Sequence, residues 1–262
     1  MEIIVCVRQT AVVREELEVA SDGRSVDLSR VNQHLNEWDS YALEEALLLV
    51  QENGGSVTVV SLGPENAEPV LFHGLAAGAQ DALHIVSVVQ DDIDNWVVAN
   101  MLSREIKKHP FDLVLTGVQA EDDGCGEVGA TIATLLGIPH ASMVVAVECE
   151  EGQNTLKVER ELDEGYHDVL RISLPALLTI QTGTRQPRYV SSMRLKRFKK
   201  KAKITKIGFE DLVSVGETVA PRTELIHIDS YQPETRNVEI LEGSPEQTVG
   251  QLLDRLYSKG VL

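Results

Sequence analysis

The sequence predicts an α/β protein built on a doubly wound, mainly parallel sheet with an antiparallel addition. In the first half of the 262 residues, apolar runs of strand length alternate with segments whose apolar residues recur at helical spacing, which is typical of parallel β-α units. From Met143 onward the helical segments stop and hairpin-like turns separate the strands, which indicates the antiparallel addition. A 43% share of hydrophobic residues is ordinary for a globular protein of this size.

The first half predicts strands and helices in alternation. Each strand is a continuous apolar run, as in parallel strands that are buried on both faces. The runs are residues 3–7, 57–62, 83–86 and 113–116. Each helix has an apolar face and a residue that starts or stops it. The helices are a segment capped by Asp39 that ends at Asn53-Gly54-Gly55, residues 65–77 before Gly78, residues 94–108 before His109-Pro110, and residues 126–136.

The second half predicts further strands and one short helix. The strands are residues 143–148, 155–161 and 168–180, the last interrupted by Leu174-Pro175-Ala176. Beyond Lys203 the chain becomes polar and less periodic, and residues 219–223 have the composition of a linker. Residues 245–256 predict an amphipathic helix with Ser244 as its cap.

The composition argues against several classes of function. A net charge of −17 disfavours binding to nucleic acid or to anionic membranes, because like charges repel. The apolar runs are shorter than the roughly 20 residues of a membrane helix, so we expect no direct membrane insertion, and residues 1–7 lack the basic flank of a signal peptide. Cys6, Cys125 and Cys149 have no metal-binding spacing, so we expect no metal and a reduced, cytoplasmic protein.

Three segments follow predicted strands at the edge of the sheet where doubly wound proteins bind ligands. They are residues 6–8, residues 62–64 and the loop 117–129, GVQAEDDGCGEVG. The glycines of this loop permit close approach of its backbone to a ligand, and the helix that follows offers free N–H groups to a phosphate. The carboxylates of Glu121, Asp122, Asp123 and Glu127 repel phosphate, so a solvated acidic loop that caps the helix remains an equal alternative.

The motifs of common nucleotide-dependent and hydrolytic enzymes are missing. The sequence has no GxGxxG after its first strand, no GxxxxGK[ST] and no GxSxG, and its cysteines and histidines lack the spacing of a nucleophilic site. We therefore predict no catalytic residue in this chain. That absence fits a subunit whose chemistry belongs to a cofactor.

Residues 158–189, VERELDEGYHDVLRISLPALLTIQTGTRQPRY, and the basic run RLKRFKKKAK that begins at Arg194 resemble the signature region of the electron-transfer flavoprotein small, or beta, subunit. The resemblance implies a Rossmann-like, adenine-nucleotide-binding fold and a heterodimer with a larger subunit that carries FAD. It also implies electron transfer through FAD between dehydrogenases, such as acyl-CoA dehydrogenases, and a membrane quinone or iron–sulfur oxidoreductase.

Two shorter segments carry the resemblance into the ligand site. The loop 117–129 is similar to the family pattern GxQAxDxDxxQxG, and residues 35–46, LNEWDSYALEEA, are similar to MNPFDEYALEEA. The resemblance implies that this subunit binds AMP or, in electron-bifurcating members, a second FAD. It implies the following cofactor-binding residues: Cys6, Val7, Asn36, Trp38, Leu62, Gly63, Asp123, Cys125, Gly126, Glu127, Val128 and Gly129.

The sequence departs from the family pattern at several places in this site, including Gly126, which stands where the family often has Asn or Ala. Glu127 stands where the family has glutamine, so the side chain accepts hydrogen bonds but cannot donate them. Glu37 replaces a proline, and Ala11-Val12-Val13 stands where the family has Pro-Asp. The resemblance implies that Asn36 and Trp38 contact the adenine or ribose of the ligand. Without the resemblance, the residues favour a turn at Asn36 and a hydrophobic staple at Trp38.

The resemblance also divides the chain by role. It implies a nucleotide-binding domain over residues 1–190, a partner-recognition loop and basic segment over 191–203, and an arm over 204–262 whose helix packs on the large subunit. The implied docking residues are Met193, Leu195, Arg197, Lys199 and Lys200. A solvated helical face is the alternative for this basic run, and the acidic chain disfavours a nucleic-acid footprint.

Three functions remain open from the sequence. The leading prediction is the small subunit of an electron-transfer flavoprotein, acting as an electron carrier. A bifurcating subunit that binds its own FAD and oxidises NADH would instead be an enzyme. A stand-alone adenine-nucleotide-binding module of the same fold class is the third, and the long extension after Ile180 argues against it, because a self-sufficient sheet needs no such arm.

Overall fold

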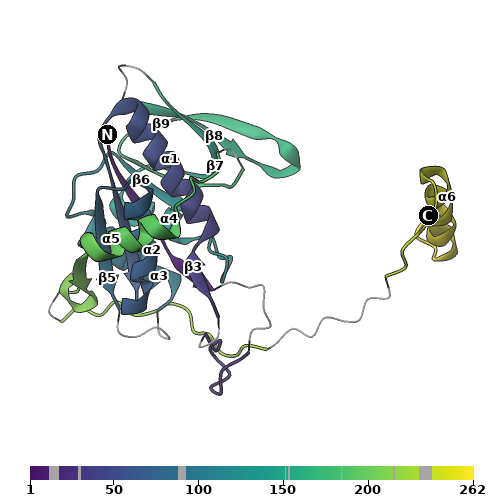
Figure 1. Cartoon of the computed structure of the whole chain (residues 1–262), viewed down its shortest axis with the longest axis horizontal. Helices are drawn as coiled ribbons and strands as arrows, with labels where there is room; N and C mark the ends of the chain where they lie inside the picture. The colour runs from purple at the N-terminus through teal and green to yellow at the C-terminus, as the bar shows by residue number, and fades with distance from the viewer. Residues whose placement is uncertain are drawn as a thin grey trace. The chain divides into compact units, whose positions relative to one another are not determined.

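The computed structural model of the protein describes residues 1–11, 18–28, 31–87, 93–150, 152, 154–183, 185–214, 216–229 and 238–262. These residues form two units, Met1–Ile228 and Asp229–Leu262. The first unit contains every described strand and the helices α1 to α5, which are labelled in Figure 1. The second contains α6 (Pro245–Ser258), whose first turn is capped by Ser244 as predicted.

Most of the described strands belong to one sheet with the order β11-β5-β4-β1-β6-β10-β7-β8-β9. Their bounds are β1 (Glu2–Cys6), β4 (Ser56–Gly63), β5 (Asp81–Val86), β6 (Leu113–Gly117), β7 (His140–Cys149), β8 (Thr155–Glu161), β9 (His167–Ser173), β10 (Ala176–Ile180) and β11 (Thr205–Gly208). The pairs from β11 to β7 are parallel, and β8 pairs antiparallel with both β7 and β9. The prediction of a mainly parallel sheet with an antiparallel addition is therefore confirmed.

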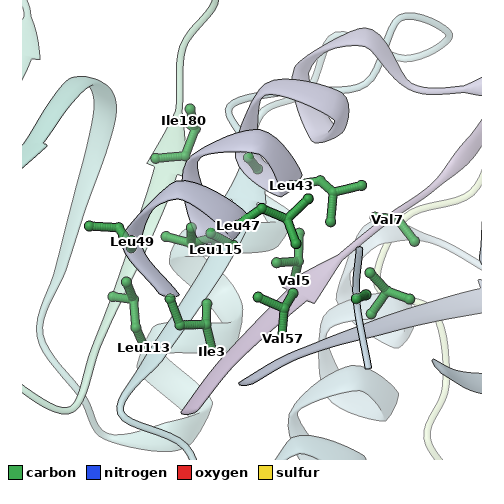
Figure 2. Close-up of a cluster of buried hydrophobic side chains, with 14 of the residues drawn as sticks. Ile3, Val5, Val7, Leu43, Leu47, Leu49, Val57, Leu113, Leu115 and Ile180 are labelled. Atoms are coloured by element: carbon green, nitrogen blue, oxygen red, sulfur yellow. The ribbon is translucent and has the colours of Figure 1, made fainter. Parts of the chain in front are cut away.

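Helices cover both faces of the parallel part. The helices α1 (Glu37–Asn53), α2 (Glu68–Ala77) and α5 (Ser192–Lys201) contribute to one apolar cluster with the sheet, and α3 (Asn95–Ile106) and α4 (Val128–Leu136) contribute to the other. The clusters alternate along β1: Ile3 and Val5 belong to the first cluster and Ile4 to the second. Figure 2 shows Ile3 and Val5 beneath the α1 residues Leu43 and Leu47. This alternation explains why the strand is a continuous apolar run.

The antiparallel hairpin of β8 and β9 differs from the parallel strands in burial. It projects beyond the helices at one end of the sheet (Figure 1). Every residue of β10 is buried, whereas Ile172 alone is buried in β9. The edge strand therefore presents both of its faces, with Val169 and Leu170 among its exposed apolar side chains.

The prediction of a single antiparallel strand over residues 168–180 is wrong. Residues 167–173 form β9, but residues 176–180 form β10, which lies between β6 and β7 and is parallel to both. Pro175 has no N–H group to donate to a ladder, and the Leu174–Pro175 peptide is cis, so the chain leaves one strand pair and enters another there. The continuous apolar run ALLTI is the sequence signal of a buried parallel strand.

Two further predictions differ from the structure. Asp39 does not cap α1, which begins two residues earlier with Asn36 at the cap position. Residues 205–208, predicted as part of a polar arm, form the edge strand β11, parallel to β5. A four-residue strand with one covered edge is too short to give a clear alternation in the sequence. The predicted linker 219–223 contains no helix or strand, but Asp94 accepts hydrogen bonds from the N–H groups of Arg222 and Thr223.

Two short strands were not expected from the sequence. The strands β2 (Gln9–Ala11) and β3 (Gln33–Leu35) form an antiparallel pair directly after β1 and directly before α1. Val12 and Val13 lie outside the described residues. Within the described part of the chain, no helix combines the length and the hydrophobicity that crossing a membrane requires.

Candidate functional site

A cavity of about 430 Å³ lies at the carboxyl ends of the parallel strands. It is lined by residues that end or follow β1, β4 and β6, namely residues 6–8, 62–64 and 116–123. In the sheet, β4 lies on one side of β1 and β6 on the other, so the strand order reverses at this point. Ligands of doubly wound proteins bind in the crevice formed there, and the volume lies in the range of small-molecule pockets.

The lining of the cavity includes two sets of side chains, which we call its apolar wall and its polar wall. The apolar wall contains Val26 and Leu28, which precede β3, Ile93, which precedes α3, and Val98 and Leu102 of α3. The polar wall contains Arg8, Asn36, Asp39, Gln119, Glu121, Asp122, Asp123 and Glu127. A planar, weakly polar ring fits the first wall, and a ligand with hydrogen-bonding groups fits the second.

All but two of the cofactor-binding residues predicted from the sequence line this cavity. Those that do are Cys6, Val7, Asn36, Leu62, Gly63, Asp123, Gly126, Glu127, Val128 and Gly129. Trp38 does not, and its Nε1 donates a hydrogen bond of 2.9 Å to Oε1 of Gln181. Residues two apart on a helix face different directions, which is why Asn36 and Trp38 separate. Cys125 is exposed to solvent beside the cavity.

Asn36 binds the loop after β6. Its side chain is almost completely buried; Nδ2 donates to the carbonyl oxygen of Gln119 at 2.9 Å, and Oδ1 accepts from the N–H of Glu121 at 3.2 Å. This pair of bonds satisfies the amide on both sides and fixes the loop above the cavity. The prediction that Asn36 has a structural role in a turn therefore agrees with its hydrogen bonds to the loop. Because Asn36 also lines the cavity, it would lie beside a bound ligand.

Asp39 joins the ends of the two central strands. Its Oδ2 accepts the N–H of Arg8, after β1, at 2.8 Å, and its Oδ1 accepts the N–H of Gly117, at the end of β6, at 2.9 Å. Burial raises the pKa of the Asp39 carboxyl to about 7, and the two N–H donors oppose that rise. The Asp39 side chain thus links the ends of β1 and β6 beside the cavity. Its predicted role as a helix cap did not include this link.

Three consecutive acidic residues of the loop are paired with groups that follow β1. Arg8 donates from Nη1 to Asp123 Oδ2 at 2.7 Å and from Nη2 to Asp122 Oδ2 at 2.9 Å. Oε2 of Glu121 lies 2.8 Å from Nε2 of His34 and accepts a hydrogen bond of 3.0 Å from the Thr10 hydroxyl. Asp122 and Asp123 are thus both ion-paired and partly exposed, so the loop is solvated as in the predicted alternative, but its carboxylates also have partners within the protein.

The loop then enters α4 through three glycines, 124, 126 and 129. Gly124 and Gly126 have φ angles of +62° and +65°, a conformation that other residues adopt at a cost. A Cβ on Gly129 would lie 2.6 Å from Cγ2 of Thr179 and 2.7 Å from Oγ1 of Thr116, so this glycine lets α4 pack closely on the sheet. Glu127 precedes the helix and makes no side-chain cap. The first N–H groups of α4 are thus left for another acceptor.

These glycines form a GxGxxG pattern that the sequence analysis did not use. The letters GCGEVG at 124–129 have the spacing that serves tight turning, close ligand approach and helix packing in dinucleotide sites. The pattern follows β6 rather than β1, which is why a search after the first strand misses it. Arg8 was also missed, although an acidic loop facing a strand end predicts a nearby cation.

The thiols of the site are not activated. Burial, and secondarily the charge of Asp39, raises the pKa of Cys6 far above its ordinary value. Partial burial, followed by the charges of Asp123 and Glu127, also raises the pKa of Cys125. Both thiols stay protonated at neutral pH, and among the described residues no cluster of His, Cys, Asp and Glu could hold a metal ion.

The predicted docking residues lie on a helix rather than on a loop. Ser191 caps α5 by accepting a hydrogen bond from the N–H of Arg194, and no residue of α5 is buried. Met193 is 82% exposed, Leu195 is half-buried, and the charged docking residues are exposed. Phe198 packs against the apolar cluster beneath α1 and α2, which fixes the helix on the first unit.

Comparison with known proteins gives a consistent result. Residues 25–212 match the family described as electron transfer flavoprotein domain. The chain is similar to the electron transfer flavoprotein subunit beta of Methylophilus methylotrophus, with 32% identity over 97% of both chains, and to that of Thermoanaerobacterium thermosaccharolyticum, with 33% identity over 100% of both. It is also similar to the mitochondrial subunit beta of Arabidopsis thaliana, with 29% identity over 99% of this chain and 98% of the relative. The family match covers β4, β6 and the loop 117–129 but begins after β1, whereas the alignments with the first two relatives cover 97% and 100% of this chain. The chain belongs to the electron transfer flavoprotein family, among its beta subunits.

Proposed function

We propose that this chain is the nucleotide-binding small subunit of a heterodimeric electron carrier. Its larger partner subunit carries FAD, and the pair moves electrons between a dehydrogenase of the acyl-CoA type and a quinone or iron–sulfur oxidoreductase. The observation that supports this most strongly is the cavity at the strand-order reversal, which leads into the N-terminus of α4. The lack of an activated nucleophile in that cavity supports a binding role for this chain.

The ligand of this cavity is an adenine nucleotide. Its adenine lies against the apolar wall, and its phosphate lies at the glycine-rich entry to α4, where backbone N–H groups and the positive end of the helix favour an anion. Asn36 and Asp39 hold the surrounding loops and supply the shape of the cavity. FAD in the heterodimer supplies the electron-carrying chemistry, and this chain supplies binding and orientation.

The ligand is AMP in a simple carrier and the adenylate part of a second FAD in a bifurcating enzyme. Both share the adenosine and the first phosphate, which are the parts that the two walls recognise. Glu127, which replaces the family's glutamine, offers an acceptor at the entry to α4 and no donor. The proposal takes AMP as the ligand, and the cofactor content of the complex tests it.

The partner surface is the basic helix α5. Met193 and Leu195 supply apolar contacts, and Arg197, Lys199 and Lys200 attract an acidic surface on the dehydrogenase. The C-terminal unit with α6 binds the large subunit, because its own unit leaves the apolar side chains of Val249, Leu252 and Leu253 on α6 uncovered. We place this complex in the cytoplasm, in line with its unpaired cysteines.

The experiment is a cofactor count. The full chain is co-purified with its large subunit, the complex is denatured, and the released FAD and AMP are separated by chromatography and quantified. One FAD and one AMP per heterodimer support the proposal. Two FAD without AMP assign the bifurcating function, with NADH oxidation as the next measurement. Nucleotide bound to this chain without any affinity for a large subunit would overturn both in favour of a stand-alone module.

A further inference from the structure

Arg8 is the one cationic side chain among the described residues that line the cavity, and it faces an unusual number of carboxylates. Five acidic residues line the same cavity, and they are Asp39, Glu121, Asp122, Asp123 and Glu127. Glu121 is paired outside the lining with His34 and Thr10. Asp122 and Asp123 are paired with Arg8 alone among the side chains for which the structure gives an ion pair.

The position of Arg8 is fixed by its own backbone. Its N–H donates to the Asp39 carboxylate at 2.8 Å, and its carbonyl oxygen accepts the N–H of Asn36 at 2.9 Å. Asn36 in turn holds the backbone of the acidic loop at Gln119 and Glu121. The guanidinium and the two carboxylates therefore approach each other from two segments that are already fastened together, so their pairing costs little additional ordering.

We propose that Arg8 is a positioning residue for the nucleotide phosphate, which it serves by pairing with Asp122 and Asp123 in the loop that leads into α4 and so offsetting one of their two negative charges. This inference rests on the proposed function of the cavity. The guanidinium binds the two carboxylates and not the phosphate. Its role is to weaken their repulsion of an anion at the glycine-rich entry.

The physical argument concerns charge at short range in a partly closed cavity. A phosphate at the start of α4 lies a few residues along the chain from Asp122 and Asp123, so their charges repel it at short range. The two carboxylates line the cavity and have side-chain exposures of 30% and 27% in their ion pairs with Arg8, so solvent screens their charges only in part. Because one guanidinium binds both carboxylates, the negative electrostatic potential at the loop is weaker than it would be with the two carboxylates alone.

The sequence around Arg8 supports a specific requirement for a cation there. Arg8 follows β1 directly, so its side chain emerges at the carboxyl end of the central strand, where the cavity lies. Lysine at this position would carry the same single charge, but its ammonium lacks the planar fork with which the arginine guanidinium binds both carboxylates at once. We therefore expect Arg8→Lys to keep part of the effect and Arg8→Gln to lose it.

The test compares AMP with adenosine, which differ by the phosphate alone. The full chain, co-purified with its large subunit and dialysed free of AMP, is titrated with each probe by calorimetry. For Arg8→Gln we expect AMP to bind about ten- to a hundredfold more weakly and adenosine to bind within about twofold of wild type. The triple variant Arg8→Gln/Asp122→Asn/Asp123→Asn restores AMP binding to within about threefold, because it removes the carboxylates with which Arg8 pairs.

The control is Arg171→Gln. It removes the same charge from an exposed residue of the edge strand β9, where Arg171 is paired with Glu150. We expect it to change neither affinity. If Arg8→Gln weakens AMP and adenosine equally, Arg8 merely supports the fold and the inference is overturned, although the nucleotide site stands. If the triple variant fails to recover AMP binding, Arg8 contacts the phosphate directly and the charge-offsetting role is wrong. If wild type binds neither probe, the proposed function fails together with the inference.

Discussion

The cavity and helix α5 are the two charged regions of the first unit, and they are held in opposite ways. In the cavity, Asp39, Glu121, Asp122 and Asp123 each have a hydrogen-bonded partner on another segment. On α5, the basic residues project from a helix without a buried residue. The difference indicates that the cavity depends on exact geometry, whereas α5 depends on net charge and accessibility.

The substitution Gly117→Ala tests the geometric side of this comparison and has the largest expected effect. A Cβ at this position would lie 2.6 Å from Cβ of Trp38 and 2.8 Å from the backbone nitrogen of Asp39, so the start of α1 must shift. Overpacking of this kind costs about 3 kcal/mol, and we expect AMP binding to be lost with it. Denaturant unfolding and calorimetry measure the two effects.

The matched control is Gly250→Ala in α6, where a Cβ meets no atom within 4 Å. Alanine favours a helix interior over glycine by about 1 kcal/mol, so this variant should not lower stability or AMP affinity. Equal losses in both variants would show that the cavity has no special sensitivity to packing.

Arg188 connects the two regions, since its residue precedes α5 and its side chain binds α1. The guanidinium donates to the buried carboxylate of Glu44 at 2.7 Å and 3.0 Å, and the Arg188 N–H donates to the same group at 3.0 Å. The substitution Arg188→Ala leaves the Glu44 carboxylate with fewer hydrogen-bond donors. Because the Arg188 side chain is 35% exposed, we expect the free energy of unfolding to fall by about 2 kcal/mol, which is less than the loss of a fully buried ion pair.

Arg185→Ala is the matched control on the same segment. Arg185 reaches Glu45 and Glu52 at only 3.9 Å, so its removal should cost less than that of Arg188. Hydrogen exchange of α5 in both variants checks whether Arg188 anchors this helix. An unchanged exchange rate in Arg188→Ala would mean that Phe198 alone fixes α5 on the first unit.

The sequence predicts β1, β4, β5 and β6 well because each of them is a largely apolar run between turn residues. It misplaces β10 because only Leu174-Pro175-Ala176 interrupts residues 168–180, and the separation of β9 from β10 depends on tertiary pairing around Pro175. The glycine-rich entry to α4 is visible in the sequence. The partners of its carboxylates are not, since Arg8 and Asp122 are far apart along the chain and the fold brings them together.

Asp39→Asn sharpens the view of the cavity floor. At pH 5 the Asp39 carboxyl is protonated in the folded state, and its hydroxyl oxygen can still accept one of the two backbone N–H groups; the amide nitrogen of asparagine cannot, so we expect a cost of about 1 kcal/mol at pH 5. The pKa of Asp39 is about 7 in the folded protein and 3.8 ordinarily, so the folded protein binds this proton more tightly than the unfolded chain does. The contribution of this proton to the free energy of unfolding is therefore complete below pH 3.8 and is lost as the pH rises through 7. The cost of the substitution should therefore shrink between pH 5 and pH 8. Urea unfolding at both values measures it, and a constant cost would mean that Asp39 does not titrate in this window.

The smallest structural effect, and the clearest contrast with the cavity, is expected from Lys199→Gln/Lys200→Gln on α5. Both side chains are exposed, so stability should change by less than about 0.5 kcal/mol. If α5 attracts an acidic dehydrogenase surface, the rate of flavin reduction in the heterodimer should fall roughly two- to fivefold at low salt and converge with wild type at high salt.

Stopped-flow measurements across ionic strength check this, with Lys107→Gln/Lys108→Gln at the end of α3 as a control of equal charge. A salt-independent loss, or an equal loss in the control, would remove α5 from the docking surface. A loss confined to α5 and to low salt would mean that charge acts there without fixed geometry, which is the opposite of how Arg8 and Asp39 act in the cavity.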